Sequence, residues 1–222
     1  MELDFWNQVW KEERLGFDQV EMNHYLKKSL STWLLETSET IFVPLCGRSI
    51  DMWELHCLGH QIVGVEYVRD ALEDFDKKFS LNMRKHFIRD SVECFETEDF
   101  KLYCADFFDL ISADIPNGEK PLKIWDRAAL VALPNDLRRE YYRQIEKLSG
   151  GNLDWLCLLF TFPAAANFGP PFSVSLTEVQ QIMIDKGFNV KVLEERHLEP
   201  KNPKFVEAGI SEFTETLIRV IS

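Results

Sequence analysis

Short buried strands alternate with amphipathic helices along most of this chain. Apolar runs bounded by turn residues predict strands at 41–44, 61–65, 101–105, 123–126 and 154–160. Helical spacing of apolar residues predicts helices at 50–58, 69–79, 135–148 and 176–186. Strands separated by segments of helix length pair in parallel through right-handed crossovers. The pattern therefore predicts an α/β fold, with a mostly parallel twisted sheet and helices on both faces.

The two ends of the chain follow other patterns. Residues 1–36 carry aromatic and aliphatic side chains at helical spacing, so we expect a helical N-terminal segment before a core at 37–222. Residues 188–197 and 213–221 alternate apolar and polar positions, and no strong helix is expected between them. They predict a C-terminal antiparallel hairpin at the edge of the sheet. A parallel body closed by such a hairpin is typical of Rossmann-like methyltransferases, whereas dehydrogenases usually continue with a sixth parallel strand.

Length and composition narrow the possible functions. The 222 residues contain no repeat and no linker, which favours a single domain over 1–222. The formal net charge of −12 opposes binding to nucleic acid or to an anionic membrane. There is no apolar run of about 20 residues and no secretory signal at the start, so we expect a cytoplasmic protein. The five cysteines and five histidines show no metal-binding spacing, and we expect no metal.

The turn after the first strand, P-L-C-G-R-S, lies where a sheet of this kind binds its ligand. It contains a single glycine, Gly47, and neither G-x-G-x-x-G nor a P-loop pattern is present. A nicotinamide-dependent oxidoreductase would need the first of these to bring its backbone close to a pyrophosphate. A cofactor without phosphates, such as S-adenosylmethionine, needs less glycine. An ordinary strand-to-helix turn is the alternative interpretation.

Acidic residues end the second and third predicted strands. Glu66 lies about twenty residues beyond the turn, where its carboxylate can accept hydrogen bonds from two ribose hydroxyls. Asp106 ends the third strand, where it can reach an adenine amino group, and Phe107 can pack on the adenine ring. Acids at strand ends are common, so Glu66 alone would leave the function open. The turn, Glu66 and Asp106 together favour a site for an adenosine-containing cofactor.

Two further segments are candidates for the walls of a pocket. Asp126 and Arg127 end the fourth strand, and they either line the cofactor and substrate cavity or form a mutual salt bridge that orients the loop. Phe168 and Phe172 flank a Gly-Pro-Pro turn and could form one wall of a substrate pocket. A plain helix start capped by Ser175 is the alternative for that segment.

Seven segments occurring in order give the chain a resemblance to a known family. They are F-W-N-Q-V-W near the start, G-F-D-Q at 16–19, V-P-L-C-G-R-S-I-D-M at 43–52, G-H-Q-I-V-G-V-E at 59–66, Y-C-A-D-F-F at 103–108, W-D-R-A-A-L-V-A-L-P at 125–134 and G-P-P-F-S-V at 169–174. With these segments the chain resembles the thiopurine S-methyltransferase family, particularly its bacterial members. The combination spans nearly the whole chain.

The resemblance implies an S-adenosylmethionine-dependent methyltransferase that releases S-adenosylhomocysteine, acts as a monomer and serves detoxification. The positions that match the family's cofactor site are Trp10, Leu45, Glu66 and Arg127, with Gly47 in the turn and Asp106 and Phe107 in the adenine-contacting segment. Phe17 matches a residue at the substrate mouth. The aromatic N-terminal segment would then be a lid over the cofactor.

The chain departs from the family near the expected acceptor pocket. Asp18 replaces the histidine that commonly follows the phenylalanine, and residues 160–168 lack the usual acidic and tyrosine residues. The methyl acceptor therefore stays open between thiopurines or other small aromatic thiols and inorganic selenium or tellurium species. A cofactor-binding protein without turnover is a further alternative. An ionised thiol attacking a sulfonium needs no strong base, so Asp18 and Arg127 are candidates for a catalytic role rather than required groups.

Overall fold

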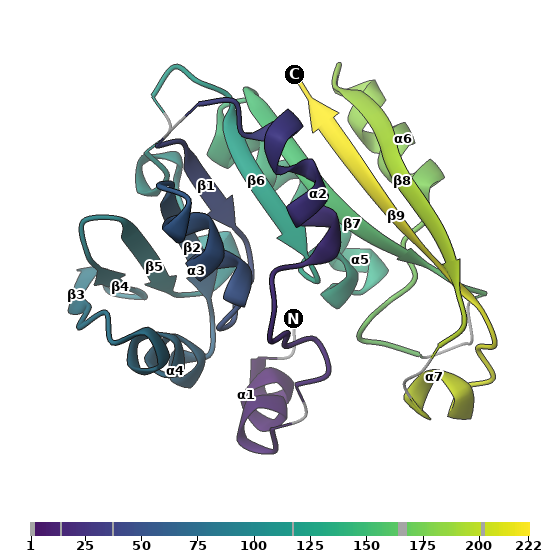
Figure 1. The fold of residues 1–222 in the computed structure, drawn as a ribbon, viewed down its shortest axis with the longest axis horizontal. Helices are drawn as coiled ribbons and strands as arrows, with labels where there is room; N and C mark the ends of the chain where they lie inside the picture. The colour runs from purple at the N-terminus through teal and green to yellow at the C-terminus, as the bar shows by residue number, and fades with distance from the viewer. Residues whose placement is uncertain (1–2, 14, 37, 117, 164–167, 201–202) are drawn as a thin grey trace. The chain divides into compact units, whose positions relative to one another are not determined.

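The computed structural model describes residues 3–13, 15–36, 38–116, 118–163, 168–200 and 203–222. Its internal contacts divide the chain into two compact units, one running up to Lys123 and the other covering Ile124–Ser222. Each unit has its own strands and helices (Figure 1). The expectation of one domain over 1–222 stays a prediction. No helix in the described residues has the length and apolar character needed to cross a membrane.

The first unit contains two N-terminal helices and five strands. Its elements are α1 (Leu3–Lys11), α2 (His24–Trp33), β1 (Thr40–Val43), α3 (Ile50–Cys57), β2 (Gln61–Glu66), α4 (Arg69–Phe79), β3 (Arg84–Arg89), β4 (Val92–Glu96), β5 (Phe100–Cys104) and the 3₁₀ turns η1 (Phe107–Asp109) and η2 (Ser112–Asp114). The strands lie in the order β3-β4-β5-β2-β1 (Figure 1). β2 pairs in parallel with β1 and β5, as the sequence predicts.

The pair β3 and β4 was not predicted. β3 pairs antiparallel with β4, and β4 pairs antiparallel with β5, so this unit is more mixed than the mostly parallel sheet expected. β3 has the sequence R-K-H-F-I-R and is largely exposed at the edge of the sheet. Edge strands often carry charged residues, which hide the alternation that predicts a strand.

The second unit contains the C-terminal strands and helices. Its elements are β6 (Leu122–Arg127), which begins just before the boundary, η3 (Leu130–Ala132), α5 (Asn135–Ser149), β7 (Leu153–Thr161), α6 (Leu176–Asp185), β8 (Asn189–Leu198), α7 (Pro203–Glu207) and β9 (Phe213–Ile221). β8 and β9 pair antiparallel, which confirms the predicted hairpin. β9 lies between β8 and β7 and is antiparallel to both, and the short α7 interrupts a segment expected to lack a strong helix.

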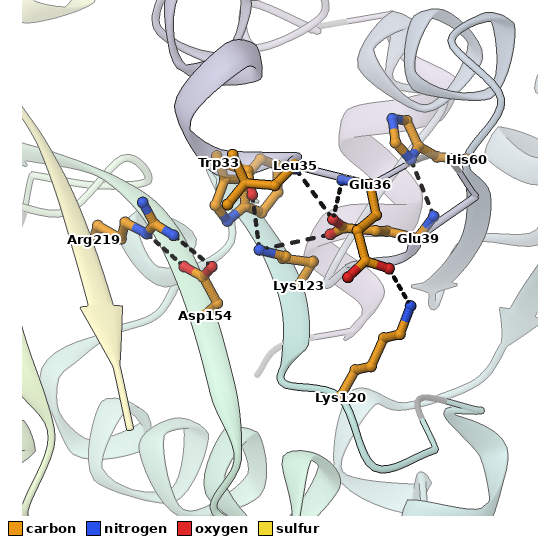
Figure 2. A network of polar contacts seen from close by, with 9 residues as sticks. All are labelled: Trp33, Leu35, Glu36, Glu39, His60, Lys120, Lys123, Asp154 and Arg219. Atoms are coloured by element: carbon orange, nitrogen blue, oxygen red, sulfur yellow. Dashed lines mark hydrogen bonds and ion pairs between the residues drawn. The ribbon is translucent and has the colours of Figure 1, made fainter.

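Polar contacts fix the strand ends opposite the predicted ligand side in each unit (Figure 2). In the first unit, the Glu39 carboxylate accepts hydrogen bonds from the backbone N–H groups of Leu35 and Glu36. The Nζ of Lys123 donates to the Trp33 carbonyl at 2.7 Å and lies 3.6 Å from the Glu39 carboxylate. In the second unit, the Arg219 guanidinium on β9 makes two 2.7 Å bonds to Asp154 on β7. These contacts tie α2 to the start of β1, and β7 to β9.

Candidate cofactor site

The turn between β1 and α3 holds its backbone in an unusual conformation. Leu45 has a φ of +45° and Gly47 a φ of +54°. The left-handed region suits glycine but strains leucine, at a cost of order 1 kcal/mol, so the surroundings must hold Leu45 there. One such contact is the hydrogen bond from the Cys46 N–H to the Val65 carbonyl at 2.9 Å. The turn is thereby fixed to β2, close to the end that carries Glu66.

A glycine in β2 makes room for this turn. A Cβ on Gly64 would lie 2.8 Å from the Cys46 Sγ and 3.0 Å from Leu102. Cys46 is buried, and burial together with the neighbouring Glu66 raises the pKa of its thiol. It is therefore a packing residue that sets the height of the turn above the sheet.

The Glu66 carboxylate joins the turn to the start of α4. Its Oε2 accepts a hydrogen bond from the Gly47 N–H at 2.9 Å, and its Oε1 accepts one from the Val68 N–H at 2.8 Å. The residue is 8% exposed, and burial raises its pKa against the opposing effect of these backbone N–H groups. An ionised carboxylate has about four lone-pair sites, more than the backbone N–H groups occupy, so it can still accept from a hydroxyl of a ligand. Glu66 thus lies where the sequence places it.

The aromatic residues of the N-terminal segment pack over this arrangement. The Trp10 ring lies 3.1 Å from the position of a Cβ on Gly47 and packs against Val68 and Ala71. The Phe17 ring lies 5.8 Å from the Trp10 ring. Trp10 therefore contacts both segments whose backbone N–H groups hold the Glu66 carboxylate. The first unit brings together four of the predicted site residues, namely Trp10, Phe17, Gly47 and Glu66.

The predicted adenine segment begins beside Glu66. The Ala105 N–H donates to the Glu66 carbonyl at 3.1 Å, and the half-buried Asp106 caps η1 by accepting from the Phe108 N–H at 3.0 Å. The Phe107 ring is 1% exposed and stacks on Phe42 at a centroid distance of 6.5 Å. In this conformation the Phe107 ring is therefore occupied by packing in the core. The roles of Asp106 and Phe107 toward adenine stay predictions.

Asp18 is part of an ion-paired cluster that the sequence alone does not predict. Its Oδ2 accepts from the Arg48 Nε at 2.8 Å, and the Arg48 Nη1 donates to Asp74 at the same distance. The Arg48 guanidinium also lies over the Trp10 ring, 5.6 Å from its centroid. Arg48 was missed because its partners are far from it in the sequence. The one signal was the unusual acid at position 18.

The remaining candidates lie in the second unit. Arg127 is half-buried at the end of β6. The adjacent Asp126 is fully buried and accepts from the Tyr141 hydroxyl at 2.6 Å and from the Leu130 N–H at 3.1 Å. Burial raises the pKa of Asp126 to about 6. Asp126 therefore orients the loop after β6 through Leu130 and Tyr141, while the cofactor role of Arg127 stays a prediction.

Phe168 and Phe172 occupy different surroundings. The Phe168 ring packs against Phe162 and Phe205, with centroid distances of 5.6 and 4.9 Å. The Phe172 ring covers Gly169 so closely that a Cβ there would lie 2.3 Å from it. Ser175 caps α6, as the plainer interpretation expects. Whether the two rings line a substrate pocket stays a prediction, and residues 164–167 of the unusual stretch lie outside the described residues.

The site consists of the Glu66 carboxylate, the backbone N–H groups that hold it, and the aromatic rings that pack beside them. Among the described residues, no group of three or more histidine, cysteine, aspartate or glutamate side chains could hold a metal ion. The fit is to a neutral, hydroxyl-bearing ligand such as a ribose. The single glycine of the turn gives little room for a pyrophosphate.

Comparison with solved structures supports the fold. One similar structure is a Burkholderia thailandensis 1,6-didemethyltoxoflavin-N1-methyltransferase with bound S-adenosylhomocysteine, with a TM-score of 0.59 at 12% identity, covering 99% of this chain and 87% of that one. Another is an S-adenosylmethionine-dependent methyltransferase from Anabaena variabilis, with a TM-score of 0.60 at 11% identity, covering 99% and 95%. The Rossmann-like methyltransferase fold predicted from the sequence is confirmed.

Comparison with known sequences identifies the family. A thiopurine S-methyltransferase from Pseudomonas putida is 34% identical over 220 residues, covering 99% of each chain. One from Shewanella baltica is 33% identical over 212 residues, covering 95% of this chain and 94% of that one. The family's own sequence pattern, described as thiopurine S-methyltransferase, matches residues 1–221. The chain therefore belongs to the thiopurine S-methyltransferase family.

Proposed function

We propose that this protein transfers a methyl group from S-adenosylmethionine to the sulfur of a thiopurine or another small aromatic thiol. The observation that carries the proposal is the Glu66 carboxylate, held at the end of β2 by the N–H groups of Gly47 and Val68. Family membership supports the methyl transfer, and a structural neighbour with bound S-adenosylhomocysteine supports the cofactor. The thiopurine acceptor rests on the names of the relatives.

In this proposal Glu66 binds the two ribose hydroxyls of the cofactor, and Asp106 binds the adenine amino group. Trp10 and the turn at Leu45 and Gly47 enclose the cofactor beside Glu66. Arg127 contributes to the cofactor site, as the family resemblance implies. The bound donor supplies an electrophilic methyl group on a positively charged sulfur.

The protein's part in the reaction is positioning and exclusion of water. The leaving group is a neutral thioether, so no acid is needed to expel it. An aromatic thiol is ionised to a large extent near neutral pH, so no strong base is needed either. Holding the reactants aligned can supply several kcal/mol of the barrier, of order 7–11 kcal/mol in well-oriented systems. Asp18 is engaged by Arg48, which favours a structural role for it over that of a base.

A methyl-transfer screen tests the acceptor. Purified protein is incubated with labelled S-adenosylmethionine and a panel of aromatic thiols, small aliphatic thiols, selenite and tellurite, and the products are identified by mass. Methylation of aromatic thiols alone supports the proposal. Turnover confined to selenite or tellurite would show that the methyl acceptor is an inorganic species and not a thiol. Cofactor binding without any turnover would point to a binding protein.

Calorimetry on the same sample tests the cofactor separately. We expect S-adenosylmethionine and S-adenosylhomocysteine to bind and nicotinamide dinucleotides not to bind. The proposal also takes the protein to be a monomer that acts in the cytoplasm in detoxification. Light scattering after size-exclusion chromatography would contradict the first of these by giving a mass of twice 26.0 kDa.

A further inference from the structure

One arginine, Arg48, connects the turn after β1 to two segments that are far from it in the sequence, the N-terminal segment and α4. Arg48 pairs with Asp18 of the N-terminal segment and with Asp74 of α4, and its guanidinium covers the Trp10 ring of α1. It lies directly after Gly47, whose N–H holds the Glu66 carboxylate. Arg48 is therefore placed to link the position of the N-terminal segment to the geometry of the candidate cofactor site.

The N-terminal segment, described at residues 3–13 and 15–22, is attached more firmly at its C-terminal end, next to Asn23. The Asn23 N–H donates to the Asp51 carboxylate at 2.7 Å, and the Asn23 side chain caps α2 by accepting from the Tyr25 N–H at 3.0 Å. Asn23 is 6% exposed and Asp51 is fully buried. A hydrogen bond from a buried backbone group to a buried carboxylate is costly to break, because both groups would be left without a partner away from water. Asn23 is thus a fixed point.

The attachment through Arg48 is weaker. The side chains of Arg48 and Asp18 are 29% and 23% exposed, so water and salt screen their attraction. Partly exposed ion pairs of this kind contribute little to stability. The segment is therefore held by a buried hydrogen bond at Asn23, by the packing of Trp10 on Val68 and Ala71, and by the partly exposed ion pair at Arg48.

We propose that Arg48 is the latch of a cover formed by residues 3–13 and 15–22, which opens about Asn23 to admit and release the cofactor. The proposal rests on the function proposed above, and it makes Arg48 a positioning residue. With the cover closed, Trp10 packs on Gly47 and Val68, and Glu66 is 8% exposed. A ribose reaches the carboxylate when Trp10 moves aside, and Arg48 resists that movement. The latch also explains Asp18, because an acid at that position pairs with the arginine.

Arg48→Gln is the test variant, and Arg69→Gln is its matched control. Arg69 also pairs with two carboxylates, those of Glu73 and Glu93, and also lies over an aromatic ring, that of Phe95 at 5.1 Å. It is in the same unit, on α4, and contributes the same charge. Both variants are compared with wild type by thermal unfolding to show that they fold.

Two measurements report on the latch. The first is the rate at which labelled S-adenosylhomocysteine leaves the protein after a chase with unlabelled compound. We expect release from Arg48→Gln to be about fivefold faster, the scale of losing two partly exposed ion pairs, and release from Arg69→Gln to match wild type. Raising the salt concentration should speed release from wild type but not from Arg48→Gln. The second is the rate of tryptic cleavage after Lys11, which should rise in Arg48→Gln alone.

The outcomes separate the latch from the proposed function. If wild type binds S-adenosylhomocysteine but both variants release it at the wild-type rate, the latch is wrong. Equal acceleration in both variants would also overturn it, because the effect would then reflect general loss of charge or stability. If wild type binds no S-adenosylhomocysteine, the proposed function fails, and unchanged cleavage after Lys11 in Arg48→Gln would then reject the latch by itself.

Discussion

At the scale of single residues, the cofactor proposal depends on the charge of Glu66. Replacing Glu66 by Gln keeps the shape of the side chain but places an amide N–H₂ against the N–H of Gly47 or Val68. We expect S-adenosylmethionine binding to weaken by about 1–3 kcal/mol, the scale for lost hydrogen bonds to a charged group. Calorimetry on the folded variant measures this, and an unchanged dissociation constant would remove Glu66 from the ribose site.

The buried Asp126 gives stability a defined pH dependence. Its pKa is raised from 3.8 to about 6 in the folded protein, so ionisation opposes folding. The stability that protonated Asp126 contributes to the folded state is fully present below pH 3.8 and is lost as the pH rises through 6. At about 1.4 kcal/mol per pKa unit, the loss approaches about 3 kcal/mol.

Asp126→Asn removes this titration and provides the measurement. The free energy of unfolding of wild type minus that of Asp126→Asn should be larger at about pH 4 than at about pH 7.5, by about 2 kcal/mol. Urea unfolding at both pH values gives the two differences. A difference that stays constant between them would show that Asp126 titrates at its ordinary pKa.

At the scale of elements, the packing of β2 against the turn after β1 sets the geometry of the site. A methyl group on Gly64 would meet Cys46 Sγ at 2.8 Å and Leu102 at 3.0 Å. We expect Gly64→Ala to destabilise the protein by about 1–3 kcal/mol, the usual cost of overpacking. It should also weaken cofactor binding, because the displaced turn carries the Gly47 N–H.

A second substitution shows whether the clash is the cause. Cys46→Ala removes the Sγ, so the double variant Gly64→Ala with Cys46→Ala should recover part of the lost stability. Urea unfolding of the two single variants and the double variant gives the coupling energy. If the double variant loses as much stability as the two single variants together, the contact between Gly64 and Cys46 is not the cause of the strain.

The elements that the sequence predicts are those with one strong local signal. Buried runs such as 61–65 and capped amphipathic helices such as α5 need no information from distant residues. β3 was missed because its residues R-K-H-F-I-R are stabilised by pairing with β4 and by ion pairs to other segments. The same limit applies within the site. Glu66 follows from the end of a strand, whereas the Arg48 cluster joins residues 26 and 30 positions apart.

At the scale of the whole molecule, the net charge of −12 bears on the cofactor itself. S-adenosylmethionine carries one more positive charge than S-adenosylhomocysteine, because its sulfur is a sulfonium. An anionic protein attracts a cationic ligand over a distance of about one Debye length, roughly 10 Å at 0.1 M salt. The association rate of S-adenosylmethionine should therefore fall severalfold between about 0.05 and 0.5 M salt, whereas that of S-adenosylhomocysteine should change little.

Because the Arg48 latch acts on both ligands equally, the ratio of the two association rates isolates the effect of charge. Stopped-flow mixing measures both rates, and a ratio that does not vary with salt would show that the overall charge has no part in cofactor capture.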